Sequence, residues 1–432
     1  MNTTKTNSQN YLGPFITMVV LMALIGLITN INQQFQGPMQ AAFLSESGDL
    51  KNTLTTLINF AFFLAYLVMG NTAARAIDKA GYRGALIRGL LILLGAFVIF
   101  ELSAFQFTSS GSTMQFFGAT LPHAYFIFLI GSFVAGTSLT YLQAAVNPYL
   151  VACDVPGTSG VQRQTIAGAG NSTMTTIGPL IVAYLIFGGK EAADIKVNSL
   201  FIPMAVLIVI VAILTIVLRK LNLPDIEGST ADKDEKLPKS VWSFSHLALG
   251  VAAIFFYVGV EVAVGANINL YAISLKDADG NSLYTIAQAA KMASFYWGGM
   301  LVGRLMGSFV SKISANVQLL FTSIASGVLV VVAILTNNPW VLVGVGLFHS
   351  IMWPAIFALA IEGLGKYTSK GSGALMMGVV GGAILPFVQG VFADVLGNWT
   401  WTWIIVVIGE IYLLYYALSG HKVKVRGDEV VA

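Results

Sequence analysis

Runs of apolar residues long enough to cross a membrane recur along most of this chain and restrict its fold more than any other feature. A helix needs roughly 20 residues to span the hydrocarbon core of a bilayer. No segment shows the short alternation of a membrane β-barrel, so helices are expected. The sequence therefore predicts an all-α membrane protein with twelve transmembrane helices. The twelve runs lie at residues 14–35, 52–74, 85–106, 121–151, 164–188, 198–218, 244–273, 284–310, 316–336, 340–364, 371–394 and 399–419.

The composition agrees with a bilayer as the surrounding solvent. Hydrophobic residues make up 56% of the 432 residues and charged residues only 10%, whereas soluble domains carry roughly 25% charged residues. The net charge of +3 is too small to indicate nucleic-acid binding. Cys153 is the single cysteine, and the four histidines are far apart. We therefore expect no internal disulfide, no metal site and no cofactor.

The distribution of positive charge predicts the orientation. The run at 14–29 lacks a small-residue cleavage site, which favours a first span over the alternative of a cleaved signal peptide. If the twelve spans alternate in direction, eighteen of the 23 Lys and Arg residues lie on the side that holds both termini. Positively charged loops stay in the cytoplasm, so both termini are predicted to be cytoplasmic.

The longest charged, non-apolar stretch divides the chain into two similar halves. It covers residues 219–240 and reads as a cytoplasmic linker between six-helix bundles at 1–218 and 241–432. Similar residues recur in equivalent spans of the two bundles, which indicates pseudo-symmetry. Transporters built from such repeats bind their substrate between the halves, near the middle of the membrane. The matching residues are NIN at 30–32 and 267–269, Pro148 and Pro354, and Pro179 and Pro386.

Polar side chains are concentrated in a few of the predicted spans. A polar group inside a bilayer is costly unless it has a partner or faces a cavity. Amides with nearby aromatic rings suit a polyhydroxylated ligand such as a sugar; the alternative for each residue is a hydrogen bond between helices. Gln143 and Asn147, four residues apart, share a helix face. The candidate substrate-binding residues are Asn30, Gln33, Gln34, Gln143, Asn147, Asn171, Tyr257, Asn267, His349, Trp353 and Gln389.

Glu261 is the candidate coupling residue, because it lies in the middle of the seventh span. A carboxylate in apolar surroundings needs a proton or a cation partner, and either H⁺ or Na⁺ would serve as the coupling ion. The alternative is an interhelical ion pair. His349 would relay protons, bind substrate or make a helix contact. For Glu410, in the last span, packing or a subunit contact is as good an interpretation as transport.

Several segments resemble known transporters. The segment GNTAARAIDKAGYRG resembles the loop motif that follows the second span in the major facilitator superfamily. Further segments resemble the fucose:proton symporter family within it, in the expected helices and order. The first motif lies at 70–84 with a degenerate copy, GRLMGSFVSKIS, at 303–314, and the others are QAAVNPYL (143–150), YVGVEVAVG (257–265), ASFYWGGMLVGR (293–304), MWPAIFALAIEGLG (352–365) and GGAILPFVQG (381–390).

The resemblance implies a secondary transporter, functional as a monomer, that takes up a monosaccharide across the bacterial cytoplasmic membrane by alternating access. Glucose, galactose and fucose are the usual substrates of the family, and helices one, four, seven and ten line its cavity. The resemblance also implies that some charged residues latch the cytoplasmic helix ends in one conformation. The predicted latch residues are Asp78, Arg83 and Arg88 in the first half and Glu362, acting near Arg304, in the second half.

The chain departs from the family where energy coupling takes place. The symporter has a carboxylate at the position of Gln33, or of Gln34 in the alternative register, and at that of Gln143. It has a glutamine at the position of Gly168. Glutamine preserves hydrogen bonding but cannot carry a proton, so a facilitative uniporter is the alternative to a cation symporter. A membrane sugar receptor is a further alternative, although no large output domain is evident. An enzyme is not expected, because no nucleophile or metal cluster occurs in the spans.

Overall fold

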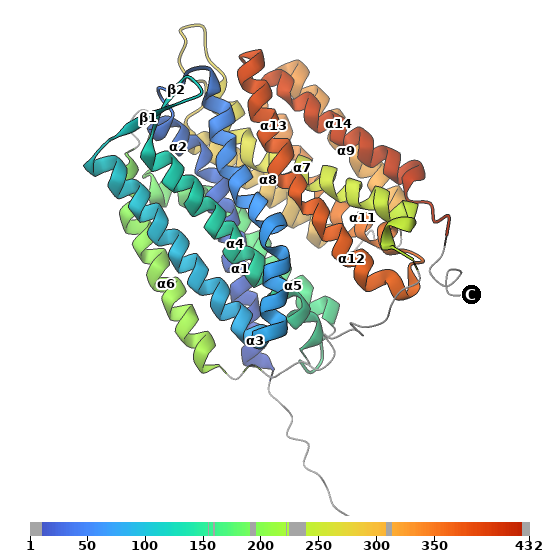
Figure 1. Ribbon diagram of the computed structural model, residues 1–432. Helices are drawn as coiled ribbons and strands as arrows, with labels where there is room; N and C mark the ends of the chain where they lie inside the picture. The colour runs from blue at the N-terminus through green and yellow to red at the C-terminus, as the bar shows by residue number, and fades with distance from the viewer. Residues whose placement is uncertain are drawn as a thin grey trace, which may run out of the picture.

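The computed structural model describes residues 11–153, 155–158, 160–190, 196–221, 223, 239–307 and 313–425, except the side chains of residues 78, 151, 152, 160–162, 366, 369 and 370. These residues form a bundle of long helices with one two-stranded sheet (Figure 1). Most of the linker predicted at 219–240 lies outside the described residues. The division into two domains at that linker therefore stays a prediction.

The α-helices before the linker follow the order of the apolar runs, with one long helix covering two of them; a short helix and two short strands are additional. They are α1 (Leu12–Gln34), α2 (Gln36–Phe43), α3 (Lys51–Ser109), β1 (Thr113–Phe116), β2 (Ala119–Pro122), α4 (His123–Ala152), α5 (Gly160–Leu180) and α6 (Phe201–Lys220). A π-helical turn, η2 (Ile181–Ile186), extends α5, and 3-10 turns η1 (Gly48–Leu50) and η4 (Val197–Leu200) precede α3 and α6.

The described residues of the second half form eight α-helices. They are α7 (Ser245–Ser274), α8 (Ile286–Gly307), α9 (Ala315–Thr336), α10 (Pro339–His349), α11 (Met352–Ile361), α12 (Thr368–Met377), α13 (Gly381–Leu396) and α14 (Ile404–Tyr415). Short turns adjoin them at η5 (Val241–Ser243), η6 (Gly365–Tyr367), η7 (Gly378–Val380), η8 (Thr400–Trp403) and η9 (Tyr416–Gly420).

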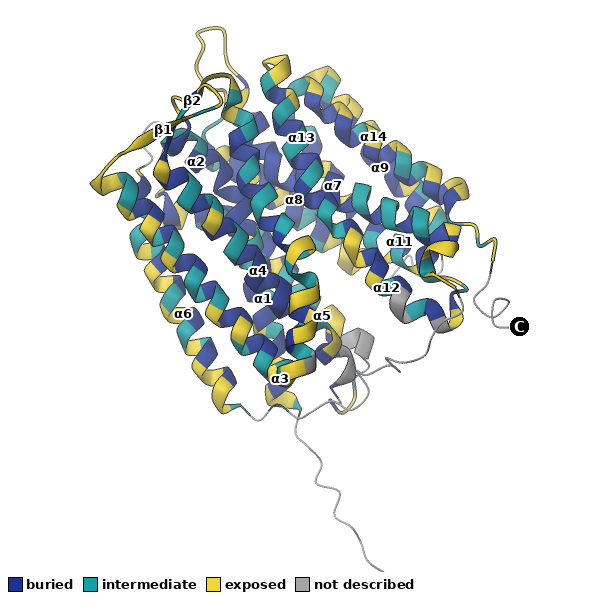
Figure 2. Ribbon diagram, in the orientation of Figure 1, coloured by how far each residue is buried: buried dark blue, intermediate teal, exposed yellow. Residues whose placement is uncertain are grey.

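The described helices account for the twelve predicted spans. Nine segments are long and apolar enough to cross a membrane, and α10 with α11 forms a tenth that bends by 40°. The remaining two are α5 and α8, which have similar length but a more polar sequence. Large apolar side chains on the outer side of α6 are exposed, among them Ile202 at 79% (Figure 2). Such a surface fits lipid rather than water.

The two arms of α3 are separate spans. The helix is broken at Gly81, whose φ of 64° favours glycine. Near the start of α4, the Tyr125 hydroxyl donates to the Leu54 carbonyl (2.7 Å), and Ser103 donates to the Ala124 carbonyl (2.7 Å). Leu54 lies near the start of α3 and Ser103 near its end, so its two arms run antiparallel. The motif at 70–84, expected in a loop, is instead helical on both sides of this single break.

The β1–β2 hairpin marks one end of the bundle, which we call the hairpin end. The opposite end, where α1 begins and α6 ends, is the terminal end. Strands of four residues are too short to give a periodic signal, and the sequence did not predict this antiparallel pair. Exposed aromatic residues occur near both ends. Phe117, Trp340 and Trp401 lie near the hairpin end, and Trp242 lies near the terminal end.

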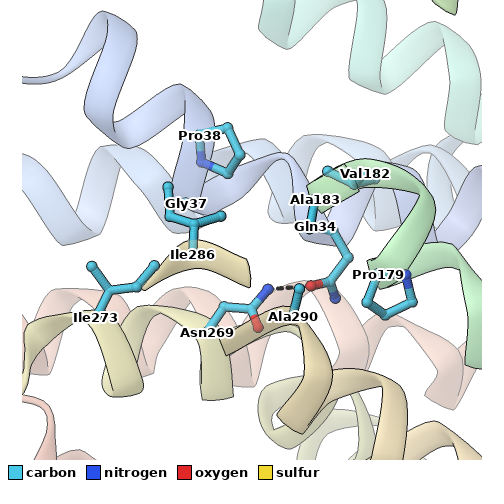
Figure 3. A pocket seen from close by; sticks show the side chains of 10 residues that line it. All are labelled: Gln34, Gly37, Pro38, Pro179, Val182, Ala183, Asn269, Ile273, Ile286 and Ala290. Carbon is cyan, nitrogen blue, oxygen red and sulfur yellow. Dashed lines mark hydrogen bonds between the residues drawn. The ribbon is translucent and has the colours of Figure 1, made fainter. Parts of the chain in front are cut away.

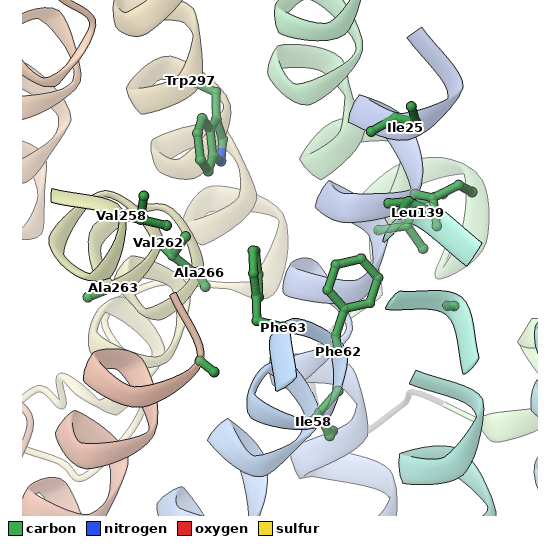
Figure 4. Close-up of a cluster of buried hydrophobic side chains, with 14 of the residues drawn as sticks. Ile25, Ile58, Phe62, Phe63, Leu139, Val258, Val262, Ala263, Ala266 and Trp297 are labelled. Atoms are coloured by element: carbon green, nitrogen blue, oxygen red, sulfur yellow. The ribbon is translucent and has the colours of Figure 1, made fainter. Parts of the chain in front are cut away.

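Small residues bring the two halves into close contact along α3 and α13. A Cβ on Gly390 would lie 2.1 Å from the Thr56 Oγ1, and one on Gly382 would lie 3.3 Å from the Phe63 ring. The Phe60 and Phe387 rings also meet, 5.1 Å apart. Figure 4 shows the apolar cluster at this level, to which both halves contribute. Close helix contact of this kind is typical of small residues in membranes.

Candidate functional site

Gln34 of α1 and Asn269 of α7 form a direct hydrogen bond between the halves (Figure 3). The Gln34 amide also donates to the Gly265 carbonyl at 3.3 Å. Both side chains are at most 6% exposed. They lie where α1, α5, α7 and α8 meet, beside a cavity of only about 10 Å³. That volume is close to the minimum for one water molecule, so the amide pair closes the space between the halves here.

A much larger polar depression opens at the hairpin end, next to this constriction. Its volume is about 670 Å³, and it shares Gly37, Ile273 and Ile286 with the lining of the small cavity. Charged side chains around it come from both halves, including Lys51, Lys276 and Asp394. A polar solute in the depression is therefore separated from the interior by the Gln34–Asn269 pair.

Asp394 of α13 caps the first turn of α3 across the two halves. Its Oδ1 accepts from the Asn52 backbone N–H at 2.9 Å, and its Oδ2 accepts from that of Thr53 at 2.6 Å. The Asn52 side chain in turn accepts from the Trp399 indole (3.0 Å) and from Gln40 (3.1 Å). A carboxylate at a helix N-terminus is stabilised by the unpaired N–H groups and the helix dipole. These contacts hold the two halves together at the hairpin end.

A second amide pair lies within the second half, where Asn267 donates to Gln389 at 2.9 Å and to the Pro386 carbonyl at 3.1 Å. Several buried amide atoms lack a hydrogen-bond partner among the described residues. Burying a polar atom without a hydrogen-bond partner costs about 1–3 kcal/mol of stability. A polar ligand that hydrogen-bonds to these atoms would recover this free energy. The atoms belong to Asn30, Asn32, Gln33, Gln36, Asn59, Gln106, Asn267, Asn269 and Gln389.

Some predicted site residues make contacts within the first half. Asn171 donates to the Met22 carbonyl at 3.0 Å. Asn30 packs against Gly178, because a Cβ there would lie 2.6 Å from its Oδ1. Gln143 donates to the Tyr66 hydroxyl at 3.0 Å. Asn147, one turn further along α4, is half-buried. Asn171 therefore makes a hydrogen bond between α5 and α1, which was the alternative to substrate binding for this residue.

Glu261 of α7 forms an ion pair with Arg304 of α8, and the same arginine reaches the first half. Its Oε1 lies 3.6 Å from Arg304 Nη2, with side-chain exposures of 13% and 41%. Arg304 also donates from Nη1 to the Ser172 hydroxyl of α5 at 2.6 Å. The Tyr257 hydroxyl lies 3.1 Å from both the Glu261 carboxylate and the His349 carbonyl, so its one hydrogen goes to one of these two acceptors. Its ring lies 6.2 Å from that of Trp353. The guanidinium that pairs with Glu261 is therefore the same group that contacts Ser172 of α5.

His349 joins this group to the last helix. Its Nε2 lies 2.7 Å from Glu410 Oε1, and its Nδ1 lies 2.8 Å from the Tyr296 hydroxyl. Tyr296 donates to the Glu261 backbone carbonyl at 3.0 Å. His349 and Glu410 are at most 2% exposed. A continuous polar chain thus crosses the second half from α14 to α7.

The predicted latch residues are placed differently from one another. Arg83 and Arg88 are exposed, whereas the Asp78 side chain lies outside the described part of the structure. Glu362 is exposed at the end of α11. Arg304, expected to act near Glu362, instead contacts Glu261 and Ser172.

The fold agrees with a known transporter architecture. The sequence profile of the Major Facilitator Superfamily matches residues 12–382. The chain belongs to the major facilitator superfamily. Solved structures show the same fold: an Escherichia coli fucose:proton symporter matches with a TM-score of 0.65 at 20% identity, covering 95% of this chain and 99% of that one. A D-xylose-proton symporter matches with a TM-score of 0.69 at 12% identity, over 95% and 99%.

Among superfamily members of similar sequence is a glucose/galactose transporter of Brucella abortus, 31% identical over 97% of both chains. A putative glucose/galactose transporter of Helicobacter pylori is 32% identical, over 97% of this chain and 98% of the relative. An L-fucose-proton symporter of Escherichia coli is 25% identical, over 90% of this chain and 89% of the relative.

The sequence analysis missed several residues of this superfamily member's polar network. Tyr66 and Tyr296 each place a hydroxyl inside a membrane helix, where it needs a partner; a search for tyrosines within the spans would have found both. Asp394 and Asn52 are 342 residues apart, so no local pattern indicates their contact. Glu410 was considered, but its pairing with His349 depends on how α10 and α14 pack.

Proposed function

We propose that this protein is a secondary transporter that takes up a hexose by alternating access. The observation that carries the proposal is the Gln34–Asn269 bond between the halves, beside amides whose buried polar atoms have no protein partner. Neutral amide donors and acceptors suit hydroxyl groups that carry no charge. The names of the relatives support glucose or galactose as the substrate class.

The closed hairpin end supports alternating access. Residues of the two halves meet there through the Asp394 cap and the Gln34–Asn269 pair. For a sugar in the 670 Å³ depression to pass, both contacts must break. The charge bias of the loops supports an orientation in which the hairpin end lies outside the cytoplasm. The relatives are bacterial, which supports the bacterial cytoplasmic membrane as the location. A single chain is proposed as the functional unit.

Glu261 is proposed as the residue that couples a cation to this movement. Its ion pair with Arg304 reaches Ser172 of the other half, so neutralising the carboxylate would change a contact between the halves. Uniport without an ion is the second candidate. It is favoured by Gln33 and Gln143, which cannot exchange protons where the related symporter family has carboxylates.

Transport by purified protein in liposomes tests these proposals. Radiolabelled D-glucose and D-galactose are expected to exchange across the membrane at equal pH, and to accumulate when a H⁺ or Na⁺ gradient is imposed. Glu261→Gln is expected to abolish accumulation and leave exchange measurable. Equilibration without accumulation under either gradient would establish uniport. Failure of both hexoses to exchange would refute the proposed substrate class.

A further inference from the structure

The proton positions in the chain from Glu410 to Glu261 follow from its hydrogen bonds. The Tyr296 hydroxyl has one hydrogen, which it donates to the Glu261 carbonyl at 3.0 Å. At its 2.8 Å contact with His349 Nδ1, Tyr296 is therefore the acceptor, and Nδ1 carries a hydrogen. His349 Nε2 then faces Glu410 Oε1 at 2.7 Å. Two acceptors would repel at that distance, so one proton lies between them.

The surroundings of this pair oppose a net charge. Glu410 lines an apolar groove of about 310 Å³ between α9 and α14, together with valine and isoleucine side chains. Gly409 packs against Val260 of α7. The sequences of α9 and α11 contain no titratable residue. With its proton the pair is neutral overall, and without it a carboxylate remains in apolar surroundings, which is unfavourable.

The titratable and charged groups that face the pair all lie on its other side. Tyr296 and Arg304 belong to α8, and Tyr257 and Glu261 to α7. Tyr257 lies between the His349 carbonyl and the Glu261 carboxylate. Tyr296 connects the His349 ring to the backbone carbonyl of Glu261. The Glu261–Arg304 pair then reaches Ser172 of the first half. The pair is thereby connected to a contact that must change when the halves move.

Glu410 has a second feature that points to a ligand. Its Oε2 has no hydrogen-bond partner among the described residues. Water does not supply one from outside, because Glu410 is only 2% exposed. A structural ion pair would be expected to satisfy both carboxylate oxygens. This one leaves an oxygen available.

We propose that Glu410 and His349 form the proton-binding site of the transporter, and that the conformation closed at the hairpin end holds the proton. Loading transfers one proton from water to the space between Nε2 and Oε1, and unloading returns it to water. Unloading leaves two facing acceptors, which must separate or admit water. The inference rests on the proposed function: the pair in α10 and α14 holds the coupling proton, and Glu261 transmits its presence to the contact with the first half.

Liposomes test this inference with Glu410→Gln, and with Glu101→Gln as a matched control for removing a carboxyl group from a membrane helix. In sodium-free buffer with an alkaline interior, wild-type protein and Glu101→Gln are expected to accumulate D-galactose at least tenfold. Glu410→Gln is expected to exchange D-galactose within about twofold of wild type and to accumulate none. Accumulation by Glu410→Gln, or wild-type accumulation that needs Na⁺, would overturn the inference. Absence of exchange in wild type would instead refute the proposed function.

A spectroscopic measurement tests the site without sugar transport. The infrared difference spectrum between acid and alkaline pH is expected to contain carboxyl or imidazolium bands that Glu410→Gln removes and Glu101→Gln retains. His349→Gln, an independent variant that still offers an amide N–H to Glu410, is expected to remove the same bands. Bands that persist in both variants would place the proton elsewhere.

Discussion

Replacing Asp394 by asparagine is expected to shift the protein away from the conformation that is closed at the hairpin end. The carboxylate holds the backbone N–H groups of Asn52 and Thr53 at 2.9 and 2.6 Å, across the boundary between the halves. Asparagine has a similar shape but lacks the charge, and only one of its two terminal atoms accepts a hydrogen bond. At least one of these two contacts is therefore lost.

The size of the shift follows from these contacts. A hydrogen bond to a charged group contributes about 1.5–3 kcal/mol, and the helix dipole adds about 0.3–1 kcal/mol. Asp394 is half-buried, so water replaces part of what is lost when the halves separate. A net change of about 1–2 kcal/mol is expected, which alters the ratio of closed to open molecules by about 5–30-fold.

Distances between spin labels at Ser45 and Thr336 measure this ratio, since the two exposed residues lie near the hairpin end on different halves. Cys153 is buried and can be replaced by serine to remove background labelling. The matched control is Asp277→Asn, because Asp277 Oδ1 also accepts from two backbone N–H groups, at 3.0 and 2.9 Å, but within one loop.

The long-distance population is expected to rise in Asp394→Asn and to stay at the wild-type level in Asp277→Asn. Identical distributions in wild type and Asp394→Asn would refute the reasoning. An equal rise in both variants would show that the loss of any carboxylate at this end, rather than the cap between the halves, determines the equilibrium.

Three further substitutions test the packing. Gly346→Ala places a Cβ 2.1 Å from the Tyr296 carbonyl oxygen and is expected to lower the stability by about 1–3 kcal/mol. The measurement is the temperature at which half of the protein in detergent remains monodisperse, which is expected to fall. Gly390→Ala would meet Thr56 of the other half at 2.1 Å, and is expected to increase the same open population without a comparable loss of stability; an unchanged distance distribution would contradict it. Tyr125→Phe removes a 2.7 Å hydrogen bond to a backbone carbonyl of α3 and is expected to destabilise by about 1–3 kcal/mol, whereas an unchanged melting temperature would contradict that expectation.

The membrane architecture was predictable because it depends on local composition. The most apolar span, α6, is recognisable from its own residues, and so are most of the others. The short β1–β2 pair and the bend between α10 and α11 were missed. The hairpin has no repeating pattern, and the bend follows His349, whose side chain is committed to Glu410 and Tyr296.

The candidate site was predictable in its residue types but not in its pairings. Amides inside apolar runs were recognised individually, yet the sequence does not show that Gln34 meets Asn269 while Asn171 meets a backbone carbonyl. These outcomes depend on the rotation of each helix about its axis. The contact of Arg304 with Ser172 rather than Glu362 has the same origin, since a long guanidinium side chain reaches several neighbours.

The exposed aromatic residues near both ends make membrane thickness part of this protein's energetics. Phe117 is attached to the first half, and Trp340 and Trp401 to the second. Aromatic rings favour the headgroup layer, so rocking of the halves moves these anchors to different depths. A difference between the depth of these anchors and the thickness of the bilayer costs fractions of a kcal/mol per ångström. Lipids with longer or shorter acyl chains are therefore expected to change the ratio of the conformations closed and open at the hairpin end.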